Sequence, residues 1–570
     1  MNLSRQASTS IGLAFFIAAC SSSSPPTSGP QTPAQAGAQQ GQAGGNAAAG
    51  ANNAAAGATA AGGGSATAGT GSGTAGASGN GTAPGAGAGG MPGAAGGGVA
   101  AGGGSAGGAV AQAGGSSMAG AAAVSLPDLV TSSDGAFWKT GTVTTVTTGT
   151  ADVTADAATK KQRWDGFGGT FNEAGWDALS VLSASDKQMA LTLLYDAANG
   201  ANFTYGRLPI GASDYAMKRY TLAETANDYT MASFTIAQDK MLLIPYIKAA
   251  LAIKPDIHLW ASPWTPPAWM KDNNSTDKGN MKDDAQVLTA FALYLEKFVQ
   301  AYAGEGITIE AIHPQNEPGY STNPYPCCGW TGALYIKFIR DYLGPQFKKD
   351  NVPAQIWCGT MSAPSDATIA TDLAKDATAM SFVKGFGLQW NANTAVSSLK
   401  STNQPIMQSE HRCGNYNGFS SPHATSTYDP NKPQNDYAYG VESWGNIKDW
   451  IDAGVNSYSA WNMVLDTLGT NLNATTPWHQ HALLVVDRAA KKLTATPAYY
   501  VFRHLSQFVA PKANVIGVSG GNALAFQNPD GAYVVVMYNS GAAKTAIVSV
   551  GGTKLQFAMP ANGWATVHHK

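Results

Sequence analysis

Charge and aromatic side chains are missing from a long stretch near the start of the chain. Residues 21–124 contain no Asp, Glu, Lys or Arg and no aromatic residue, and almost every position is Ala, Gly, Ser, Thr, Pro, Gln or Asn. Such a segment cannot bury enough apolar surface to offset the conformational entropy that is lost on ordering. The composition excludes a packed domain here and predicts a disordered, Gly/Ala-rich spacer.

A concentrated basic region is also missing. The 34 Lys and Arg residues are balanced by 36 Asp and Glu residues, which gives a net charge of −2, and no basic block or basic helix face occurs. Nucleic acids and anionic lipid surfaces attract clusters of positive charge. We therefore expect no nucleic-acid partner. No stretch after the first 20 residues is long and apolar enough to cross a membrane as a helix.

Cysteine is scarce, with five residues in a chain of 570. Four of them, Cys327, Cys328, Cys358 and Cys413, follow the spacer, and they are too few for a disulfide scaffold. A bridge from Cys327 or Cys328 to Cys413 and free buried thiols are both open. No Cys-x-x-Cys or His-x-x-x-His spacing occurs, so we expect no metal site.

The first 20 residues are typical of an export signal. Arg5 supplies a positive charge, and residues 11–17 form an apolar run that is too short to remain as a membrane-spanning helix. The string Ile17-Ala-Ala-Cys20 resembles a bacterial lipobox, in which the cysteine is lipid-modified after cleavage. We expect an exported protein that is lipid-anchored at Cys20 to the bacterial cell envelope. An ordinary signal peptide and a secreted protein are the alternative.

The chain after the spacer has the pattern of two folded regions, and it contains all 14 tryptophans. Residues 125–163 include alternating Val and Thr, which is typical of strands. Residues 164–496 alternate strand-type and helical segments, which predicts an α/β fold of the (β/α)₈ barrel type. From 497 to 570 the helical pattern stops and short strands predict an antiparallel β-sandwich, which residues 125–163 would join. The eight expected barrel strands are 164–170, 203–211, 257–264, 307–315, 355–360, 385–390, 405–410 and 456–464.

Two of these strands end at a glutamate that stands among hydrogen-bonding side chains. Glu317 lies in the string His313-Pro-Gln-Asn-Glu-Pro318 at the fourth strand, and Glu410 lies in Met407-Gln-Ser-Glu-His-Arg412 at the seventh. Because the strand ends of a parallel barrel point at one site, we expect the two carboxylates to converge. Hydrolysis of a glycosidic bond needs such a pair, with one carboxyl group protonated and the other ionised.

Neighbouring residues fit the same chemistry. The amide of Asn316 can hydrogen-bond a sugar hydroxyl, and the cations His411 and Arg412 are expected to keep Glu410 ionised. Asp214 can accept from two sugar hydroxyls, although a helix or turn cap is the alternative for this residue. We expect Trp264 to line the cleft, whereas Trp269 is assigned to the core.

Several longer motifs follow one another in the order found in one known family. They are Trp164-Asp-Gly-Phe-Gly-Gly-Thr-Phe, Arg207-Leu-Pro-Ile-Gly-Ala-Ser-Asp-Tyr, Ala261-Ser-Pro-Trp-Thr-Pro-Pro-Ala-Trp-Met-Lys, Gln315-Asn-Glu-Pro and Ser409-Glu410. Residues from about 140 to 570 thereby resemble glycoside hydrolase family 30, the family of glucosylceramidases and endo-β-1,6-glucanases. The resemblance implies a (β/α)₈ barrel with a side β-sandwich and a retaining mechanism. An enzyme of this family would require no metal or organic cofactor.

The resemblance also implies roles for individual residues. Glu317 would be the acid/base and Glu410 the nucleophile. The residues that would line the pocket for the terminal sugar are Asp214, Trp264, Asn316 and Trp461. Glucosylceramidase-like members carry His-Trp-Tyr at the sixth strand end, where this chain has Gln389-Trp390-Asn391. Gln389 can still hydrogen-bond substrate but does not titrate.

The sequence therefore predicts a retaining β-glycosidase acting on β-glucosidic linkages, of the β-1,6-glucanase or glucosylceramidase type. Its partner would be a β-linked oligosaccharide, polysaccharide or glycolipid, and it would meet a membrane only through a lipid anchor at Cys20. One alternative is a retaining glycosidase of another β-linked sugar, such as a xylan, fucoside or galactan. Another is a non-catalytic carbohydrate-binding surface lipoprotein.

Overall fold

The computed structural model describes residues 125–415, 429, 431–472 and 479–570. The expected signal peptide, the lipid site at Cys20 and the spacer therefore lie outside the described residues. Across the described ranges, no helix combines the length and the apolar character that a membrane crossing requires.

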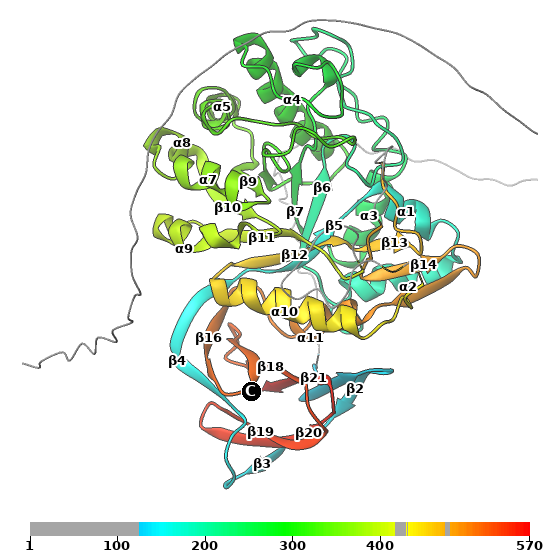
Figure 1. Cartoon of the computed structure of the whole chain (residues 1–570), viewed down its shortest axis with the longest axis vertical. Coiled ribbons are helices and arrows are strands. Elements are labelled where there is room, and N and C mark those ends of the chain that lie inside the picture. Colours follow the sequence, from blue (N-terminus) through cyan, green and yellow to red (C-terminus); the bar gives the residue numbers. More distant parts are fainter. Residues whose placement is uncertain (1–124, 416–428, 430, 473–478) are drawn as a thin grey trace, which may run out of the picture. The chain divides into compact units, whose positions relative to one another are not determined.

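Eight parallel strands close into a barrel, in the order β10-β11-β12-β5-β6-β7-β8-β9 (Figure 1). All eight segments predicted from the sequence contribute a strand, which confirms the (β/α)₈ barrel. The first segment supplies β5 only from Gly166, because Trp164 ends the preceding strand β4. The strands are β5 (Gly166–Thr170), β6 (Tyr205–Pro209), β7 (His258–Ser262), β8 (Ala311–Ile312), β9 (Gln355–Met361), β10 (Val383–Leu388), β11 (Ile406–His411) and β12 (Ser457–Asn462).

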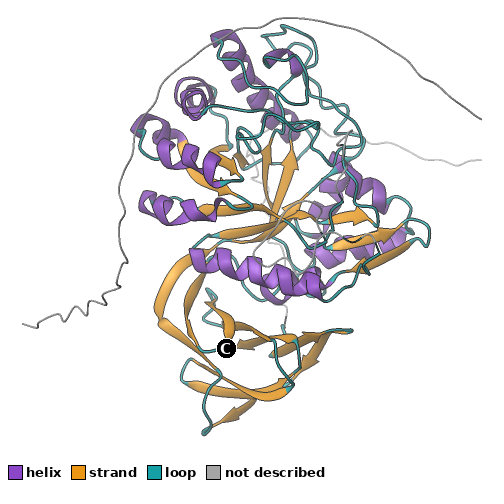
Figure 2. Cartoon of the chain, viewed as in Figure 1, coloured by secondary structure: helices purple, strands orange, loops and turns teal. Residues whose placement is uncertain are grey.

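Helices surround the barrel strands (Figure 2). They are α1 (Glu173–Leu179), α2 (Ala184–Tyr195), α3 (Leu243–Ile253), α4 (Ala285–Gly304), α5 (Gly332–Phe338), α6 (Gly344–Lys349), α7 (Pro364–Leu373), α8 (Ala377–Phe382), α9 (Val396–Leu399) and α10 (Ala438–Ala453). The side chain of Asp284 caps α4 by accepting hydrogen bonds from the backbone N–H groups of Gln286 and Val287 at 2.9 and 3.0 Å. The apolar stripe of α4 faces the core, as its spacing predicts.

Helix α3 begins later than its sequence pattern indicates. The apolar spacing predicts a helix from residue 236, but the structure starts it at Leu243. Pro245 is the third helical residue, and proline is tolerated in the first turn of a helix but not in its interior. The proline therefore sets the start of the helix, and residues before it form turns.

Ten of the remaining strands confirm the β-sandwich. They form one ten-stranded sheet in the order β2-β1-β21-β18-β17-β16-β4-β19-β20-β3, in which every pair except β19–β4 is antiparallel. Four of the strands precede the barrel in the chain, as predicted, and alternate side chains of the sheet enclose a separate apolar core. They are β1 (Leu129–Ser133), β2 (Ala136–Gly141), β3 (Thr144–Val146), β4 (Val153–Trp164), β16 (Ala513–Ser519), β17 (Asn522–Gln527), β18 (Tyr533–Asn539), β19 (Lys544–Val550), β20 (Thr553–Met559) and β21 (Gly563–His569). A small three-stranded sheet, β13 (Val464–Asp466), β14 (Leu484–Asp487) and β15 (Lys492–Ala495), follows the last barrel strand.

The expectation that helices stop at residue 497 is wrong, because helix α11 occupies Pro497–Ser506. Thr496 caps this helix by accepting a hydrogen bond from the backbone of Tyr499 at 3.3 Å, and Pro497 takes the first helical position. The buried ring of His504 then hydrogen-bonds Thr566 and Ser132, each at 2.8 Å. Helix α11 thus connects the barrel helices to strands β1 and β21 of the sandwich.

A carboxylate is buried beside the start of α3. Asp239 has no exposed surface, and its two oxygens accept hydrogen bonds from the hydroxyls of Tyr220 and Tyr302, each at 2.8 Å. Burial raises the pKa of Asp239 to about 7, although the two tyrosine hydrogen bonds act in the opposite direction. An unfolded Asp has a pKa near 3.8, so the folded state holds a proton that the unfolded state loses between about pH 4 and 7.

This residue should therefore lower the stability of the fold as the pH rises. We expect Asp239→Asn to increase the free energy of unfolding at pH 8 by on the order of 2–4 kcal/mol, because the amide avoids the buried charge. Urea unfolding of both proteins at pH 4 and pH 8 measures the effect. The two proteins should be similar at pH 4, where Asp239 is protonated in the folded state, and an equal difference at both pH values would contradict the assignment.

Candidate active site

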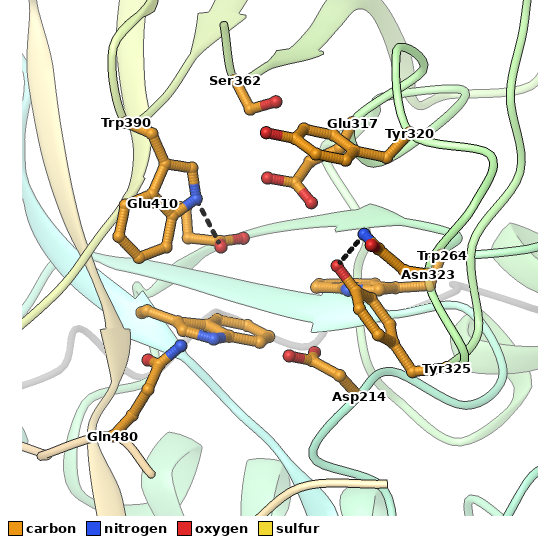
Figure 3. Close-up of a pocket in the computed structure, with 11 residues that line it drawn as sticks. Asp214, Trp264, Glu317, Tyr320, Asn323, Tyr325, Ser362, Trp390, Glu410 and Gln480 are labelled. Atoms are coloured by element: carbon orange, nitrogen blue, oxygen red, sulfur yellow. Dashed lines mark hydrogen bonds between the residues drawn. The ribbon is translucent and has the colours of Figure 1, made fainter. Parts of the chain in front are cut away.

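A pocket of about 140 Å³ lies at the carboxyl ends of the barrel strands (Figure 3). Every strand from β6 to β12 supplies a lining side chain, either from its end or from the loop that follows. This end of a parallel barrel is where active sites are found. The lining residues are Asp214, Trp264, Glu317, Tyr320, Asn323, Tyr325, Ser362, Trp390, Glu410, Trp461 and Gln480.

One buried guanidinium organises the floor of this pocket. Arg207, on β6, has no exposed surface and forms an ion pair with Glu410. It also donates to the Ser262 hydroxyl at 2.9 and 3.2 Å and to the Asn316 side-chain oxygen at 2.6 Å. Its guanidinium carbon lies 4.4 Å from the centre of the Trp264 ring. The carboxylate of Glu410 is thereby held in one position by a charge that cannot be lost.

The cation beside Glu410 is not the one that the sequence suggested. Arg412 pairs instead with Glu442 of α10, and both side chains are buried. Residues two apart in a regular strand share a face, but the register of β11 with β12 shifts between Gln408 and His411, and Arg412 lies beyond the last residue of the strand, so the alternation does not extend to it. The signal for Arg207 was present in the sequence as the only charge in the apolar segment Tyr205–Pro209.

Glu410 accepts a second hydrogen bond from a tryptophan side chain. The indole N–H of Trp390 donates to its other carboxylate oxygen at 3.0 Å, as Figure 3 shows. Trp390 follows β10 and has a positive φ of 48°, a conformation that a bulky residue rarely adopts. Both oxygens of Glu410 therefore have a fixed donor.

Glu317 points into the same pocket from the loop after β8 rather than from the strand itself. Strand β8 ends at Ile312, five residues before Glu317. The expectation that Glu317 closes this strand is therefore wrong. The residue has a φ of 49°, which costs about 1–2 kcal/mol, and its backbone N–H donates to the Thr360 oxygen at 2.9 Å. The Gln389 amide donates to one carboxyl oxygen of Glu317 at 3.2 Å.

The two carboxyl groups differ in electrostatic environment. Burial raises the pKa of Glu317 well above its usual value, and the negative charges of Glu410, Asp366 and Asp214 add to this. Burial also raises the pKa of Glu410, but the charge and hydrogen bond of Arg207 oppose the shift. Glu410 therefore ionises at a lower pH than Glu317. Over an intermediate pH range, one group is a carboxylate and the other a carboxylic acid.

Asn316 and Gln389 are buried beside the two glutamates, and neither is among the side chains that line the pocket. The side-chain oxygen of Asn316 accepts from Arg207, from the Thr360 hydroxyl at 2.8 Å and from Gln389 at 3.4 Å. Because these partners are donors, the amide nitrogen of Asn316 must be directed away from them. The Gln389 oxygen accepts from the Ser409 hydroxyl at 3.2 Å, which orients its own amide toward Glu317.

Asp214 and two tryptophans complete the part of the pocket that the sequence predicted. Trp264 and Trp461 stack with their ring centres 5.2 Å apart, and both line the pocket. Asp214 is buried, and one of its oxygens has no hydrogen-bond partner in the described part of the chain. Burial and the charge of Glu410 raise the pKa of Asp214 well above its usual value. An unpartnered buried oxygen is costly, so it marks a place where a ligand hydroxyl would be favourable.

Sequence reasoning missed several lining residues. Tyr320, Asn323 and Tyr325 come from the loop after Glu317, where the Asn323 amide donates to the Tyr325 hydroxyl at 2.8 Å. Gln480 comes from the segment before β14, and the Asn462 amide donates to its side-chain oxygen at 3.1 Å. Loops carry no periodic signal, so only the tertiary structure could bring these residues to the site.

The four cysteines and His481 are buried, and they line no part of the active-site pocket. Cys327, Cys328, Cys358 and Cys413 are all free and buried, which decides between the two alternatives left open by the sequence. Within these same ranges, no group of three His, Cys, Asp or Glu residues could hold a metal ion. His481 hydrogen-bonds the Gln434 backbone oxygen at 3.0 Å, and burial lowers its pKa to about 4.

Comparison with known protein families identifies the fold and the reaction class. The model of the glycosyl hydrolase family 30 TIM-barrel domain matches residues 164–509, and the model of the family 30 beta-sandwich domain matches residues 513–567. The chain belongs to glycosyl hydrolase family 30. It is therefore a glycoside hydrolase, and its substrates are β-linked glycosides.

Several relatives carry one of two kinds of name. The lysosomal acid glucosylceramidase of Mus musculus is 26% identical over 405 residues, which cover 67% of this chain and 75% of that protein. The endo-1,6-beta-D-glucanase neg1 of Aspergillus fumigatus is 26% identical over 409 residues, covering 67% of this chain and 79% of that protein. A solved endo-beta1,6-glucanase superposes with a TM-score of 0.67 at 22% identity, covering 77% of this chain and 99% of its own. That structural likeness supports the shared fold.

The role of Arg207 can be tested through the pH dependence of this glycosidase. We expect Arg207→Lys to move the ascending limb of the kcat/KM profile to higher pH and to lower kcat/KM by about 10²-fold, because a lysine loses the fixed hydrogen bonds that favour ionised Glu410. The profile is measured with an aryl β-glycoside that the wild-type enzyme hydrolyses.

Arg412→Lys is the matched control, since it alters a second buried Arg–Glu pair that does not include Glu410. It should lower stability while leaving the ascending limb where it is. A shift of the limb in Arg412→Lys but not in Arg207→Lys would restore the sequence-based assignment of the cation.

Proposed function

We propose that this family 30 enzyme is a retaining β-glycosidase that hydrolyses β-glucosidic linkages by double displacement. The observation that carries the proposal is the pair of buried carboxyl groups, Glu317 and Glu410, which face into one pocket with unequal pKa shifts. Glycosidases that use two carboxyl groups need this inequality, because one group must give a proton while the other acts as an anion, and membership of family 30 is what favours the retaining course.

In the first step Glu317 is the general acid. Its oxygen that accepts from Gln389 is the carbonyl oxygen of the protonated group, so the proton lies on the other oxygen. That oxygen protonates the glycosidic oxygen as the bond to the anomeric carbon breaks. Glu410 attacks the anomeric carbon from the opposite face and forms a glycosyl–enzyme ester.

In the second step Glu317 becomes the general base. Formation of the ester removes the negative charge of Glu410, which is one of the causes that raise the pKa of Glu317. The pKa of Glu317 therefore falls when the intermediate forms, and the ionised group can take a proton from water. The water attacks the anomeric carbon, Glu410 leaves, and the sugar is released with its original configuration.

The terminal sugar would be held by Asp214, Trp264, Trp461 and the Asn316 amide. The unpartnered oxygen of Asp214 can accept from a ring hydroxyl, and the stacked tryptophans offer an apolar surface for the C–H face of the sugar. Asn316 is anchored through its oxygen to Arg207, so its N–H is free to donate to the sugar 2-hydroxyl. A contact at that hydroxyl strengthens in the transition state.

The names of the relatives support a glucosyl substrate. They are glucosylceramidases and endo-1,6-beta-D-glucanases, and both kinds of substrate contain glucosyl units. The string Gln389-Trp390-Asn391 departs from the His-Trp-Tyr of glucosylceramidase-like members, with a non-titrating amide beside Glu317. This departure favours a 1,6-β-glucan over glucosylceramide.

The mechanism predicts distinct behaviour for the two glutamate variants. We expect Glu410→Ala to lose at least about 10⁴-fold in kcat, and azide should restore activity by forming an α-glycosyl azide in place of the nucleophile. Glu317→Ala should keep the first step on substrates with good leaving groups, and azide should then give a β-glycosyl azide. The anomeric configuration of the azides and of the wild-type product is read by NMR.

Glu296→Gln provides a matched control, because Glu296 is a buried glutamate of α4 that lies outside the pocket. It should retain wild-type kcat. A panel of 1,6-β-glucan, other β-glucans, glucosylceramide and xylan completes the test, with the highest kcat/KM expected on 1,6-β-glucan. The mechanism would be contradicted if the first product had inverted configuration, or if either alanine variant kept the wild-type rate. A preference for xylan would change only the proposed substrate.

We further propose that the enzyme is exported and attached to the cell envelope through a lipid on Cys20. The support is the lipobox-like string Ile17-Ala-Ala-Cys20 followed directly by the long spacer of residues 21–124. We expect labelled palmitate to be incorporated into the wild-type protein but not into Cys20→Ser. The variant should appear in the soluble fraction or remain unprocessed, and equal labelling of both proteins would contradict the lipid site.

A further inference from the structure

A second cavity, of about 380 Å³, lies at the amino-terminal end of the barrel. Its lining includes the first residues of several strands, such as Tyr205 of β6, His258 of β7 and Gln355 of β9. The active-site pocket lies at the carboxyl ends of the same strands, and the two cavities share no lining residue. The volume is more than ten times the roughly 30 Å³ that one water occupies, so it has room for a small molecule.

Three stacked rings form the inner wall of this cavity. His313 lies between Trp260 and Trp357, with ring centres 4.3 Å and 5.5 Å away and interplanar angles of 29° and 15°. Gly387 makes room for the histidine, since a Cβ at that position would lie 2.6 Å from the imidazole Nδ1. All three rings line the cavity and are at least nine-tenths buried.

Polar atoms of this wall have no partner among the residues that the structure describes. They are both ring nitrogens of His313 and the indole nitrogen of Trp260. Burial, with a contribution from Arg207, lowers the pKa of His313 well below its usual value, so the ring is neutral and offers one donor and one acceptor. The Nδ1 atom of His313 packs against Gly387, so the Nε2 atom of His313 and the indole nitrogen of Trp260 are the two atoms whose free-energy cost a hydrogen-bonding ligand would recover.

The charges at the rim of the cavity are largely paired with one another. Arg163 lies 2.6 Å from Asp165, and His258 lies 2.8 Å from Glu310. Lys384 is the remaining cation of the lining, and its side chain is exposed to solvent. The rim therefore has no concentrated charge that would select a phosphate or a carboxylate.

We propose that this cavity is a second binding site, whose ligand is a neutral monosaccharide ring. A pyranose has apolar C–H faces that fit the tryptophan and tyrosine walls, and its hydroxyls both donate and accept. It can therefore partner the neutral imidazole of His313 and the indole N–H of Trp260 together. A flat aromatic ligand fits the walls but supplies fewer hydrogen bonds, and an anionic ligand would find only the exposed, solvated Lys384 outside the paired rim charges.

D-glucose is a suitable probe, and the first readout is its effect on the melting temperature. Ligand binding to the folded state raises the melting temperature with concentration. D-glucitol at the same concentrations is the control for general stabilisation by polyols, because it lacks the ring. We expect the glucose-specific increase to be reduced in Gln355→Trp, which blocks the cavity mouth from an exposed position, and in His313→Phe, which keeps the stacked ring but removes both nitrogens.

Gln286→Trp makes the same substitution at an exposed position of α4 that lines neither cavity, and it should behave as wild type. His313→Phe should also unfold at an equal or higher temperature without sugar, since it removes unpartnered polar atoms. A crystal soaked in D-glucose should show the ring against Trp260 or Trp357. Identical glucose shifts in wild type, Gln355→Trp and His313→Phe would overturn the proposal, as would a cavity that takes imidazole or indole but no glucose.

This test is independent of catalysis. It uses the intact enzyme and measures binding, so the second site can fail while the double-displacement mechanism holds. Loss of activity in the Glu410 variant likewise leaves the melting-temperature comparison unaffected. The two proposals therefore have separate outcomes.

Discussion

The geometry of the active site depends on the burial of one positive charge. The guanidinium of Arg207 is enclosed by the barrel and by the rings of Trp260, Trp264 and Trp461, whose centres lie 5.1, 4.4 and 5.5 Å from its carbon. A charge removed from water must be matched by an opposite charge and by hydrogen bonds, otherwise the fold loses several kcal/mol. Glu410 supplies the opposite charge, and Ser262 and Asn316 accept the hydrogen bonds.

The burial of this charge also makes the pKa values of the two catalytic carboxyl groups unequal. Glu317 and Glu410 are both buried, so desolvation alone would raise the pKa values of both. Arg207 offsets the shift for Glu410. Among the described residues, the side chain of Glu317 accepts a hydrogen bond from the neutral amide of Gln389, and the repulsion of nearby carboxylates raises its pKa further. An acid and a base thus stand in one pocket without a metal-binding cluster in the described residues.

The sequence was most informative for elements that have a periodic pattern of apolar residues. Each of the eight barrel strands overlapped a segment predicted from the sequence, and Glu317 and Glu410 stood near strand ends. Helix α11 was missed because it is a single helix after the repeating pattern, although Ala498, Val501, Phe502 and Leu505 have helical spacing and are all buried. Helix α3 was placed too early because its proline was not used as a start signal.

By itself, the sequence determined the barrel, the sandwich and the two carboxylates that meet at one end of it. These follow from local patterns, since strand length, turn residues and strand-end side chains are encoded by neighbouring positions. The partner of Glu410 is different: Arg207 and Arg412 are both arginines, and only the closure of the barrel brings β6 across from β11 and turns Arg412 toward Glu442. The tyrosines and Gln480 of the loops, and the stack of His313 between two tryptophans, were likewise decided by the tertiary structure. Long-range packing selects such contacts, because burial and electrostatic pairing depend on which strands and loops become neighbours.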